Sequence, residues 1–325
     1  MTTTTLRILP AVVLAAACGT VQAQTKWDMP TPYVDGEFHT QNIRTFAEDV
    51  KKATGGQLDT VVHSGQSLIK HPDILRAVST GQVNIAEFLL GQFCNEDPVF
   101  AADNLPFVAV GYAASFKFYQ AQKPYLEKKL QSRGVRLLYS VAWPGQGIYT
   151  KTPLKTVADL KGTKFRTYSP QTARLAELLG ASPTVIQATD IPQAFATNTV
   201  QAMITSSATG VSFKAWEYVK NYYTTSAMHP KNVVVVNERS WQRLPDNQKK
   251  ALTDAAAAAE KRGWTLSAER EKSGNETLAK NGIAVAPPDA AMKAALEAVG
   301  KTMLVEWLKT AGPDGPAIIN AYQAN

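Results

Sequence analysis

Histidine and cysteine are the side chains best suited to metal binding and nucleophilic catalysis, and the 325 residues include four histidines and two cysteines. His39, His63, His71 and His229 show none of the spacings that place two metal ligands on one helix face. Cys94 precedes two acidic residues, whose charges raise a thiol pKa, so a core or loop cysteine is the favoured interpretation. The sequence also lacks a nucleophile elbow, a P-loop and a complete dinucleotide-binding glycine motif. It therefore predicts no enzyme, no metal site and no cofactor.

The segment 159–170 (DLKGTKFRTYSP) places one arginine where ligands often bind. Gly162 ends a helical turn, a strand follows, and Ser169-Pro170 has the capping chemistry of a new helix. Arg166 thus falls at the carboxyl end of a strand and beside a helix N-terminus, a position that suits a carboxylate ligand in an open α/β sheet. A surface salt bridge is the alternative for such an arginine.

The elements around this arginine alternate between helices and strands, which favours parallel sheets flanked by helices. Apolar residues at helical spacing and alternating or continuous β-branched runs define the ranges. The predicted helices are 43–50, 73–80, 171–179, 245–280 and 289–309, and the predicted strands are 58–63, 83–90, 135–141, 163–167, 185–186 and 282–287.

One of these helices is unusually long. Residues 245–280 are rich in alanine and contain no proline after Pro245. Because a helix rises about 1.5 Å per residue, this segment outruns a single small lobe. It predicts one long helix, or two nearly continuous ones, lying along two lobes, and the length of 325 residues also favours two lobes.

The first 23 residues have the pattern of a secretory signal peptide. Arg7 precedes an apolar run, ending at Cys18, that is too short to span a bilayer. Small residues stand three and one positions before Gln24, which predicts cleavage after Ala23 and a periplasmic location. Lipid attachment at Cys18 is the alternative, although the leucine of its motif stands one place too early.

The charge pattern excludes some partners. Lysine and arginine number 34 against 27 aspartates and glutamates, but the positive charges are scattered rather than gathered in a run. No nucleic-acid-binding or membrane-binding tail is therefore predicted. The excess is a weak bias toward acidic ligands.

The segment that carries Arg166 resembles the solute-binding proteins of tripartite ATP-independent periplasmic (TRAP) transporters, the DctP-like family. Members carry a similar aspartate-leucine-lysine-glycine turn followed by a strand with a ligand-binding arginine. The resemblance extends from about Trp27 to the C-terminus. Segments that agree in order and spacing are 54–56 (TGG), 73–78 (DILRAV) before Gly81, 104–107 (NLPF), His229, Trp241 and 244–245 (LP).

The resemblance implies an α/β protein of the two-lobed periplasmic-binding-protein type (type II-like), with mixed sheets flanked by helices and a long helix spanning both lobes. We expect lobe I to contain residues 24–142 and 232–271, lobe II to contain 143–231 and 299–325, and 272–298 to connect them. It further implies that Arg166 pairs with a substrate carboxylate in the cleft between the lobes. The implied partners are the organic acid and the membrane subunits of a TRAP transporter, with the receptor a monomer.

The sequence departs from the family pattern near this arginine. Members that hold longer acids often carry a second arginine upstream, where this chain has Trp143 and the neutral Gln146. Gln146 can orient a carbonyl or hydroxyl group but cannot neutralise a second carboxylate. Ser206 and Ser207 stand where the family has larger polar and acidic groups, which leaves room in the pocket.

Aromatic side chains are candidates to fill that room, with ordinary core packing as the alternative for each. The candidate aromatic contacts are Tyr33, Phe88, Phe93, Trp143, Tyr168 and Trp216. Glu87 interrupts an apolar strand, so it either accepts hydrogen bonds from the ligand or pairs with Lys70 or Arg76. His229 either lies in the cleft or has a structural role.

Together these features predict a periplasmic receptor that captures a small organic monocarboxylate. The preferred class is a 2-oxo or 2-hydroxy acid, including acids with an aromatic or branched tail. The family resemblance alone implies delivery of the acid to a sodium- or proton-coupled transporter. A dicarboxylate or a sugar acid is the alternative within this class. A sensory module that presents its ligand to a membrane kinase would need the same closing cleft. An exported enzyme would need a nucleophile with a positioned base, which no motif supplies.

Overall fold

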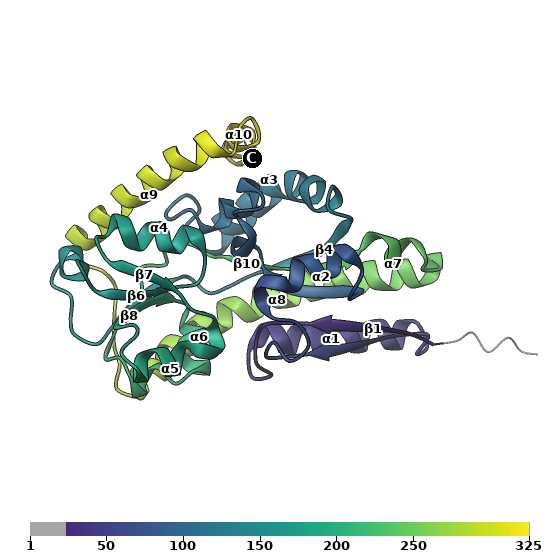
Figure 1. Ribbon diagram of the computed structural model, residues 1–325, viewed down its shortest axis with the longest axis horizontal. Helices are drawn as coiled ribbons and strands as arrows, with labels where there is room; N and C mark the ends of the chain where they lie inside the picture. Colours follow the sequence, from purple (N-terminus) through teal and green to yellow (C-terminus); the bar gives the residue numbers. More distant parts are fainter. Residues whose placement is uncertain (1–23, 325) are drawn as a thin grey trace, which may run out of the picture.

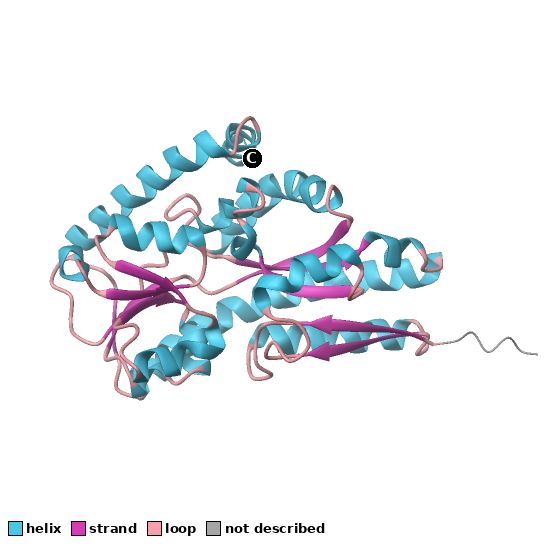
Figure 2. Ribbon diagram, in the orientation of Figure 1, coloured by secondary structure: helices cyan, strands magenta, loops and turns pink. Residues whose placement is uncertain are grey.

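The computed structural model describes residues 24–324. The predicted signal peptide and the lipid-attachment alternative at Cys18 lie outside these residues. Two groups of strands, one on each side of the molecule, are covered by helices and joined by extended segments (Figure 2). We call them the first lobe and the second lobe.

The first lobe contains a parallel pair of strands and a three-stranded antiparallel sheet, ordered β3-β10-β4, with β1 in contact with β3. Its helices pack against these strands because their apolar faces are buried. The strands are β1 (Thr25–Pro30), β2 (Leu58–His63), β3 (Ile85–Leu89), β4 (Val135–Ala142) and β10 (Lys231–Asn237), and the helices are α1 (Phe38–Ala53), α2 (Ile74–Thr80) and α3 (Tyr112–Gln131).

The second lobe is built on a six-stranded mixed sheet with the order β11-β9-β5-β8-β6-β7. The strands are β5 (Gly147–Thr150), β6 (Lys164–Thr167), β7 (Ser182–Val185), β8 (Ala202–Thr205), β9 (Asn221–Tyr223) and β11 (Ala284–Ala286). Neighbouring residues face opposite sides, since Ile204 joins the main core and Met203 a smaller cluster on the other face. The helices are α4 (Pro170–Leu178), α5 (Ile191–Ala196) and α6 (Ser207–Ser212).

A 35-residue helix, α8 (Asp246–Lys280), contacts both lobes (Figure 1). It follows the short α7 (Glu238–Gln242), packs on α1 and β4 in the first lobe, and then packs on α6 in the second. Two glycines allow the close approach: a Cβ at Gly263 would stand 2.4 Å from Val141, and one at Gly274 would stand 2.8 Å from Ser207. The predicted long helix that spans both lobes is therefore present.

The chain ends with α9 (Ala290–Thr310) and α10 (Asp314–Ala324). Helix α9 contacts α4 of the second lobe and the short helix Pro98–Asn104 of the first, and α10 packs on α3 (Figure 1). The last helix, α10, therefore lies beside α3 of the first lobe. The predicted lobe boundaries stay a prediction.

The predicted elements correspond to observed ones. Helices 43–50, 73–80, 171–179, 245–280 and 289–309 match α1, α2, α4, α8 and α9, and five of the predicted strands match β2, β3, β4, β6 and β11. The sixth, 185–186, overlaps β7 only at Val185. The expectation of parallel sheets from β–α alternation is wrong in part. β10 enters between β3 and β4 and runs antiparallel to both, and β5 runs antiparallel to β8 and β9, so the sheets are mixed, as the family resemblance implied.

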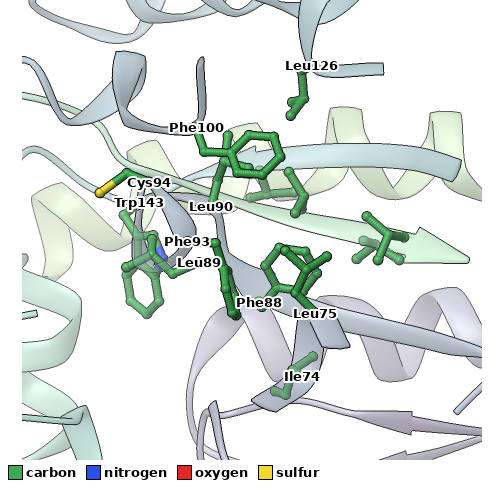
Figure 3. Packing of buried hydrophobic residues seen from close by; sticks show 14 of the residues in the cluster. Ile74, Leu75, Phe88, Leu89, Leu90, Phe93, Cys94, Phe100, Leu126 and Trp143 are labelled. Carbon is green, nitrogen blue, oxygen red and sulfur yellow. The ribbon is translucent and has the colours of Figure 1, made fainter. Parts of the chain in front are cut away.

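Within the described residues, none of the helices combines the length and apolar character needed to cross a membrane. The main core takes side chains from both lobes, and its part in the first lobe includes Phe88, Leu90, Phe93 and Phe100 (Figure 3).

Candidate ligand-binding site

Arg166 lies on β6, inside the six-stranded sheet, opposite Thr184 of β7 and Met203 of β8. The chain leaves β6 through Ser169, whose hydroxyl caps α4 by accepting a hydrogen bond from the N–H of Thr172. The predicted position of Arg166, at the carboxyl end of a strand and beside a helix N-terminus, is confirmed. Its side chain is only 2% exposed.

The Arg166 guanidinium has backbone partners and no acidic one among residues 24–324. Nε donates to the carbonyl oxygen of Ile186 at 3.0 Å, and Nη1 donates to that of Ile204 at 3.2 Å. Nη2 has no hydrogen-bond partner in the described chain. Burial lowers the pKa of Arg166 to about 10, so the group stays positive at neutral pH. It therefore retains both its charge and a free donor for an anion.

A cavity of about 40 Å³ lies against this guanidinium at the junction of the lobes. The predicted residues Tyr33, Trp143, Arg166 and Tyr168 line it. Trp143 and the unpredicted Pro230 lie on the two segments that cross between the lobes, and the N–H of Trp143 donates to the Pro230 carbonyl at 2.7 Å. The cavity is therefore walled by both lobes and by their paired connections.

Tyr33 and Trp143 share one polar anchor. The Tyr33 hydroxyl and the Trp143 indole N–H both donate to Oδ1 of Asn232, at 3.2 and 2.8 Å. Their ring centroids lie 4.9 Å apart with an edge-to-face arrangement. Because both polar ends bond to Asn232, the rings form a fixed wall of the cavity.

Tyr168 lies beside the arginine, with its ring centroid 5.4 Å from Cζ of Arg166. Its hydroxyl is buried and has no hydrogen-bond partner in the described residues. Burial raises the pKa of Tyr168 far above its ordinary value, so the hydroxyl keeps its proton. A buried donor left without a partner is costly, and a ligand oxygen would satisfy it.

Several other predicted contacts do not line this cavity. Gln146 is buried, and its amide donates to the carbonyl of Pro144 at 2.8 Å. Ser206 caps α6 by accepting from the N–H of Thr209, and Ser207 bonds backbone carbonyls of α8. Trp216 packs against the smaller hydrophobic cluster. Phe88 and Phe93 pack against each other with centroids 4.9 Å apart (Figure 3).

Glu87 is buried and does not line the cavity. It accepts a hydrogen bond from the Thr31 hydroxyl at 2.7 Å and lies 3.5 Å from Nδ1 of His39. The predicted pairing of Glu87 with Lys70 or Arg76 is therefore wrong. Arg76 instead forms an exposed pair with Asp73 on the same helical turn.

Sequence reasoning missed the polar half of the cavity. Its unpredicted lining residues are His71, Leu89, Gln187, Ala188, Thr205, Thr209 and Pro230. Gln187 follows β7, and Thr205 ends β8. The rule that found Arg166, which looks at the carboxyl ends of strands, would also have found these two residues. The sequence analysis predicts no strand at the position of β8 and names no ligand contact after the strand 185–186.

The cavity lining contains one cationic side chain, Arg166, and no carboxylate. Burial lowers the pKa of His71 to about 4, so this ring is neutral at the pH of the periplasm. The lining therefore favours a ligand with a single negative charge and neutral polar groups.

Among Cys94 and the four histidines considered for metal or thiol chemistry, His71 alone lines the cavity. Within residues 24–324, no group of three or more histidine, cysteine, aspartate or glutamate side chains is arranged to hold a metal. Cys94 is part of the hydrophobic core, and burial raises the pKa of its thiol to about 11 (Figure 3). His229 is buried, and its Nδ1 lies 3.1 Å from the Trp143 carbonyl oxygen. It does not line the cavity, so of the two predicted alternatives the structural role fits.

Three solved structures of solute receptors are similar to this chain over nearly their whole length. The chain is 50% identical to DctP6 of Bordetella pertussis, an extracytoplasmic solute receptor binding pyroglutamic acid, with a TM-score of 0.91 over 93% of this chain and 100% of that one. DctP7 of the same species, also binding pyroglutamic acid, is 44% identical, with a TM-score of 0.91 over 92% and 99% of the two chains. A TRAP solute-binding protein from a marine metagenome, specific for pyroglutamate, is 37% identical, with a TM-score of 0.91 over 93% and 100%.

The family model of DctP, described as bacterial extracellular solute-binding protein, family 7, matches residues 34–309. This family is a class of receptors rather than of enzymes, and its members act in the periplasm. The two lobes, the helix that braces them and the buried arginine in the cavity between them agree with that match. The chain belongs to the DctP family and is a periplasmic solute receptor of the TRAP type.

Proposed function

We propose that this receptor captures a compact monocarboxylate, with pyroglutamate as the first candidate, by pairing the ligand carboxylate with Arg166. The observation that carries the proposal is the buried guanidinium, which faces a cavity and has no acidic partner in the described chain. A carboxylate would accept from the free Nη2 donor and neutralise the charge. The three receptors described above, each binding pyroglutamate, support the same ligand.

The charge of the lining selects for one carboxylate. A second carboxylate would be buried without a counter-charge, which costs several kcal/mol. An ammonium group would be equally unpaired, because no acidic residue lines the cavity. Pyroglutamate carries a carboxylate and a neutral amide, so it satisfies both conditions, whereas glutamate and proline do not.

The size of the cavity points the same way. Its volume of about 40 Å³ is a few times the roughly 10–15 Å³ that one water molecule requires. This favours a compact acid over the sugar acid kept as an alternative. Among compact acids, a cyclic amide acid now takes precedence over 2-oxo and 2-hydroxy acids, because the relatives at 37–50% identity bind one.

Calorimetric titration of the mature protein with L-pyroglutamate tests the proposal. Arg166→Gln should lower affinity about 10- to 100-fold, because a charge-assisted hydrogen bond contributes roughly 1.5–3 kcal/mol. Arg44→Gln is the matched control, since Arg44 is exposed and pairs with Asp35 away from the cavity. Unchanged affinity in Arg166→Gln would refute the arginine–carboxylate pair.

Delivery to the membrane subunits of a TRAP transporter is the role that family membership supports, and we propose that the receptor acts as a monomer. Deleting the gene should abolish pyroglutamate uptake. A strain that retains uptake and loses only a transcriptional response to the acid would favour the sensory alternative.

A further inference from the structure

His71 and Gln187 meet across the junction of the lobes and both line the ligand cavity. His71 begins the short helix His71–Asp73 in the first lobe, and Gln187 follows β7 in the second. His71 Nδ1 lies 2.9 Å from Oε1 of Gln187. The direction of this hydrogen bond depends on where the histidine carries its proton.

The backbone of β3 fixes that proton. The N–H of Leu89 donates to Nε2 of His71 at 3.3 Å. Since a backbone amide can only donate, Nε2 is the unprotonated nitrogen, and the ring proton is on Nδ1. A doubly protonated ring would leave the Leu89 N–H facing another donor inside the protein.

The groups around the ring leave this tautomer in place. Glu87 favours the charged ring electrostatically, but burial outweighs it and lowers the pKa of His71 to about 4. The Tyr33 ring lies 6.2 Å away and, like Phe93 at the same centroid distance, carries no charge. Nδ1–H therefore donates to Gln187 Oε1.

This hydrogen bond orients the Gln187 amide. With Oε1 held by His71, the Nε2 amino group is on the opposite arm and has no partner in the described residues. Because Gln187 lines the cavity, its two free N–H donors are within reach of a ligand there. They cannot accept a hydrogen bond, so they suit a carbonyl oxygen and reject a ligand N–H or ammonium at this point.

A second contact holds the pair across the lobes. Gln66 accepts from the backbone N–H of His71 through Oε1 and donates to the Thr189 hydroxyl through Nε2, both at 3.0 Å. Gln66 has a φ of 62°, a left-handed conformation that is strained for a residue other than glycine. The amide of Gln187 is thus fixed only when the two lobes come together.

We propose that Gln187 is a specificity-determining residue that recognises a neutral carbonyl oxygen on the ligand, and that His71 is the positioning residue that sets its amide. This inference rests on the proposed function, because it assumes that the ligand carboxylate occupies Arg166. Gln187 is then the second residue, after Arg166, that recognises the ligand, and its contact with His71 joins the two lobes. Pyroglutamate, with a ring carbonyl away from its carboxylate, has this chemistry.

Two ligands that differ only in the carbonyl isolate the effect. Calorimetry with 3-oxocyclopentanecarboxylate and cyclopentanecarboxylate should show a preference of at least about 10-fold for the ketone in the unaltered protein. Gln187→Met should reduce this preference to about 2-fold or less. His71→Phe should give a smaller reduction, because the Gln187 amide would no longer be held in one orientation. Gln193→Met, at an exposed position on α5, is the matched control and should retain it.

The ratio of the dissociation constants of the two acids is measured within one protein. Partial misfolding of a variant therefore does not change this ratio. Retention of the full preference in Gln187→Met would overturn the inference, while Arg166-dependent binding of L-pyroglutamate would still support the proposed function. If the unaltered protein bound neither these two acids nor L-pyroglutamate, the proposed function would fail as well.

Discussion

The buried guanidinium of Arg166 is held in the sheet by two backbone carbonyls rather than by a carboxylate. Carbonyl dipoles offset part of the cost of burying a charge, and they leave its net charge unneutralised. A carboxylate ligand would supply the missing counter-charge.

Tyr168 provides a test of ligand contact at the level of a single atom. Because its buried hydroxyl lacks a partner, Tyr168→Phe should leave the free energy of unfolding unchanged or raise it by about 1 kcal/mol. Affinity for L-pyroglutamate should fall about 5- to 10-fold through loss of one hydrogen bond. Urea denaturation and calorimetry measure the two quantities.

Tyr218→Phe is the control for that comparison. The Tyr218 hydroxyl donates to the carbonyl of Phe213 and does not line the cavity, so its removal should lower stability and leave affinity unchanged. A Tyr168→Phe protein with lower stability and unaltered affinity would show that this hydroxyl serves the fold rather than the ligand.

At the scale of the elements, α8 couples the lobes because glycine lets it approach other chain segments closely. Asn42 of α1 donates to the Ala259 carbonyl of α8 at 3.0 Å, close to where Gly263 packs on Val141. The alanine-rich pattern predicted this helix, but helix propensity alone favours alanine at residue 263. Packing against β4, which the local sequence does not contain, reverses that preference.

Gly263→Ala should therefore destabilise the protein. Its gain in helix propensity is at most about 1 kcal/mol, whereas overpacking against Val141 and Asn42 costs about 1–3 kcal/mol. Ser273→Ala, at an exposed position of the same helix, should be neutral or slightly stabilising. Urea denaturation compares them, and a more stable Gly263→Ala protein would contradict the close approach.

Across the whole molecule, the junction of the lobes depends on a histidine that must stay neutral. The pKa of His71 is about 4 when buried and about 6.5 in an unfolded chain, so the unfolded state binds more protons between these values. Stability from this group is fully present above about pH 6.5 and is lost as the pH falls toward 4. The full effect is about 3 kcal/mol.

His71→Asn should flatten this part of the pH profile of unfolding free energy, measured by denaturation from pH 4 to 8. The unaltered protein is the reference because other buried groups also titrate there. Burial lowers the pKa of His229, which acts in the same direction, and raises the pKa values of Glu37 and Asp103, which act in the opposite one. Identical profiles for the two proteins would exclude a neutral His71 as the cause.

Local sequence chemistry predicted α1, α2, α4, α8 and α9, most of the strands and the place of Arg166, because periodicity, caps and strand ends depend on neighbouring residues. It made no prediction for α3, which contains Pro124, or for β10, which runs antiparallel between two strands from earlier in the chain. Only the tertiary structure decided which side chains share the cavity. Tyr33, His71, Trp143 and Gln187 are far apart in sequence and meet only in the folded molecule. The Gln146 amide bonds to the Pro144 carbonyl, a contact that the sequence analysis does not predict.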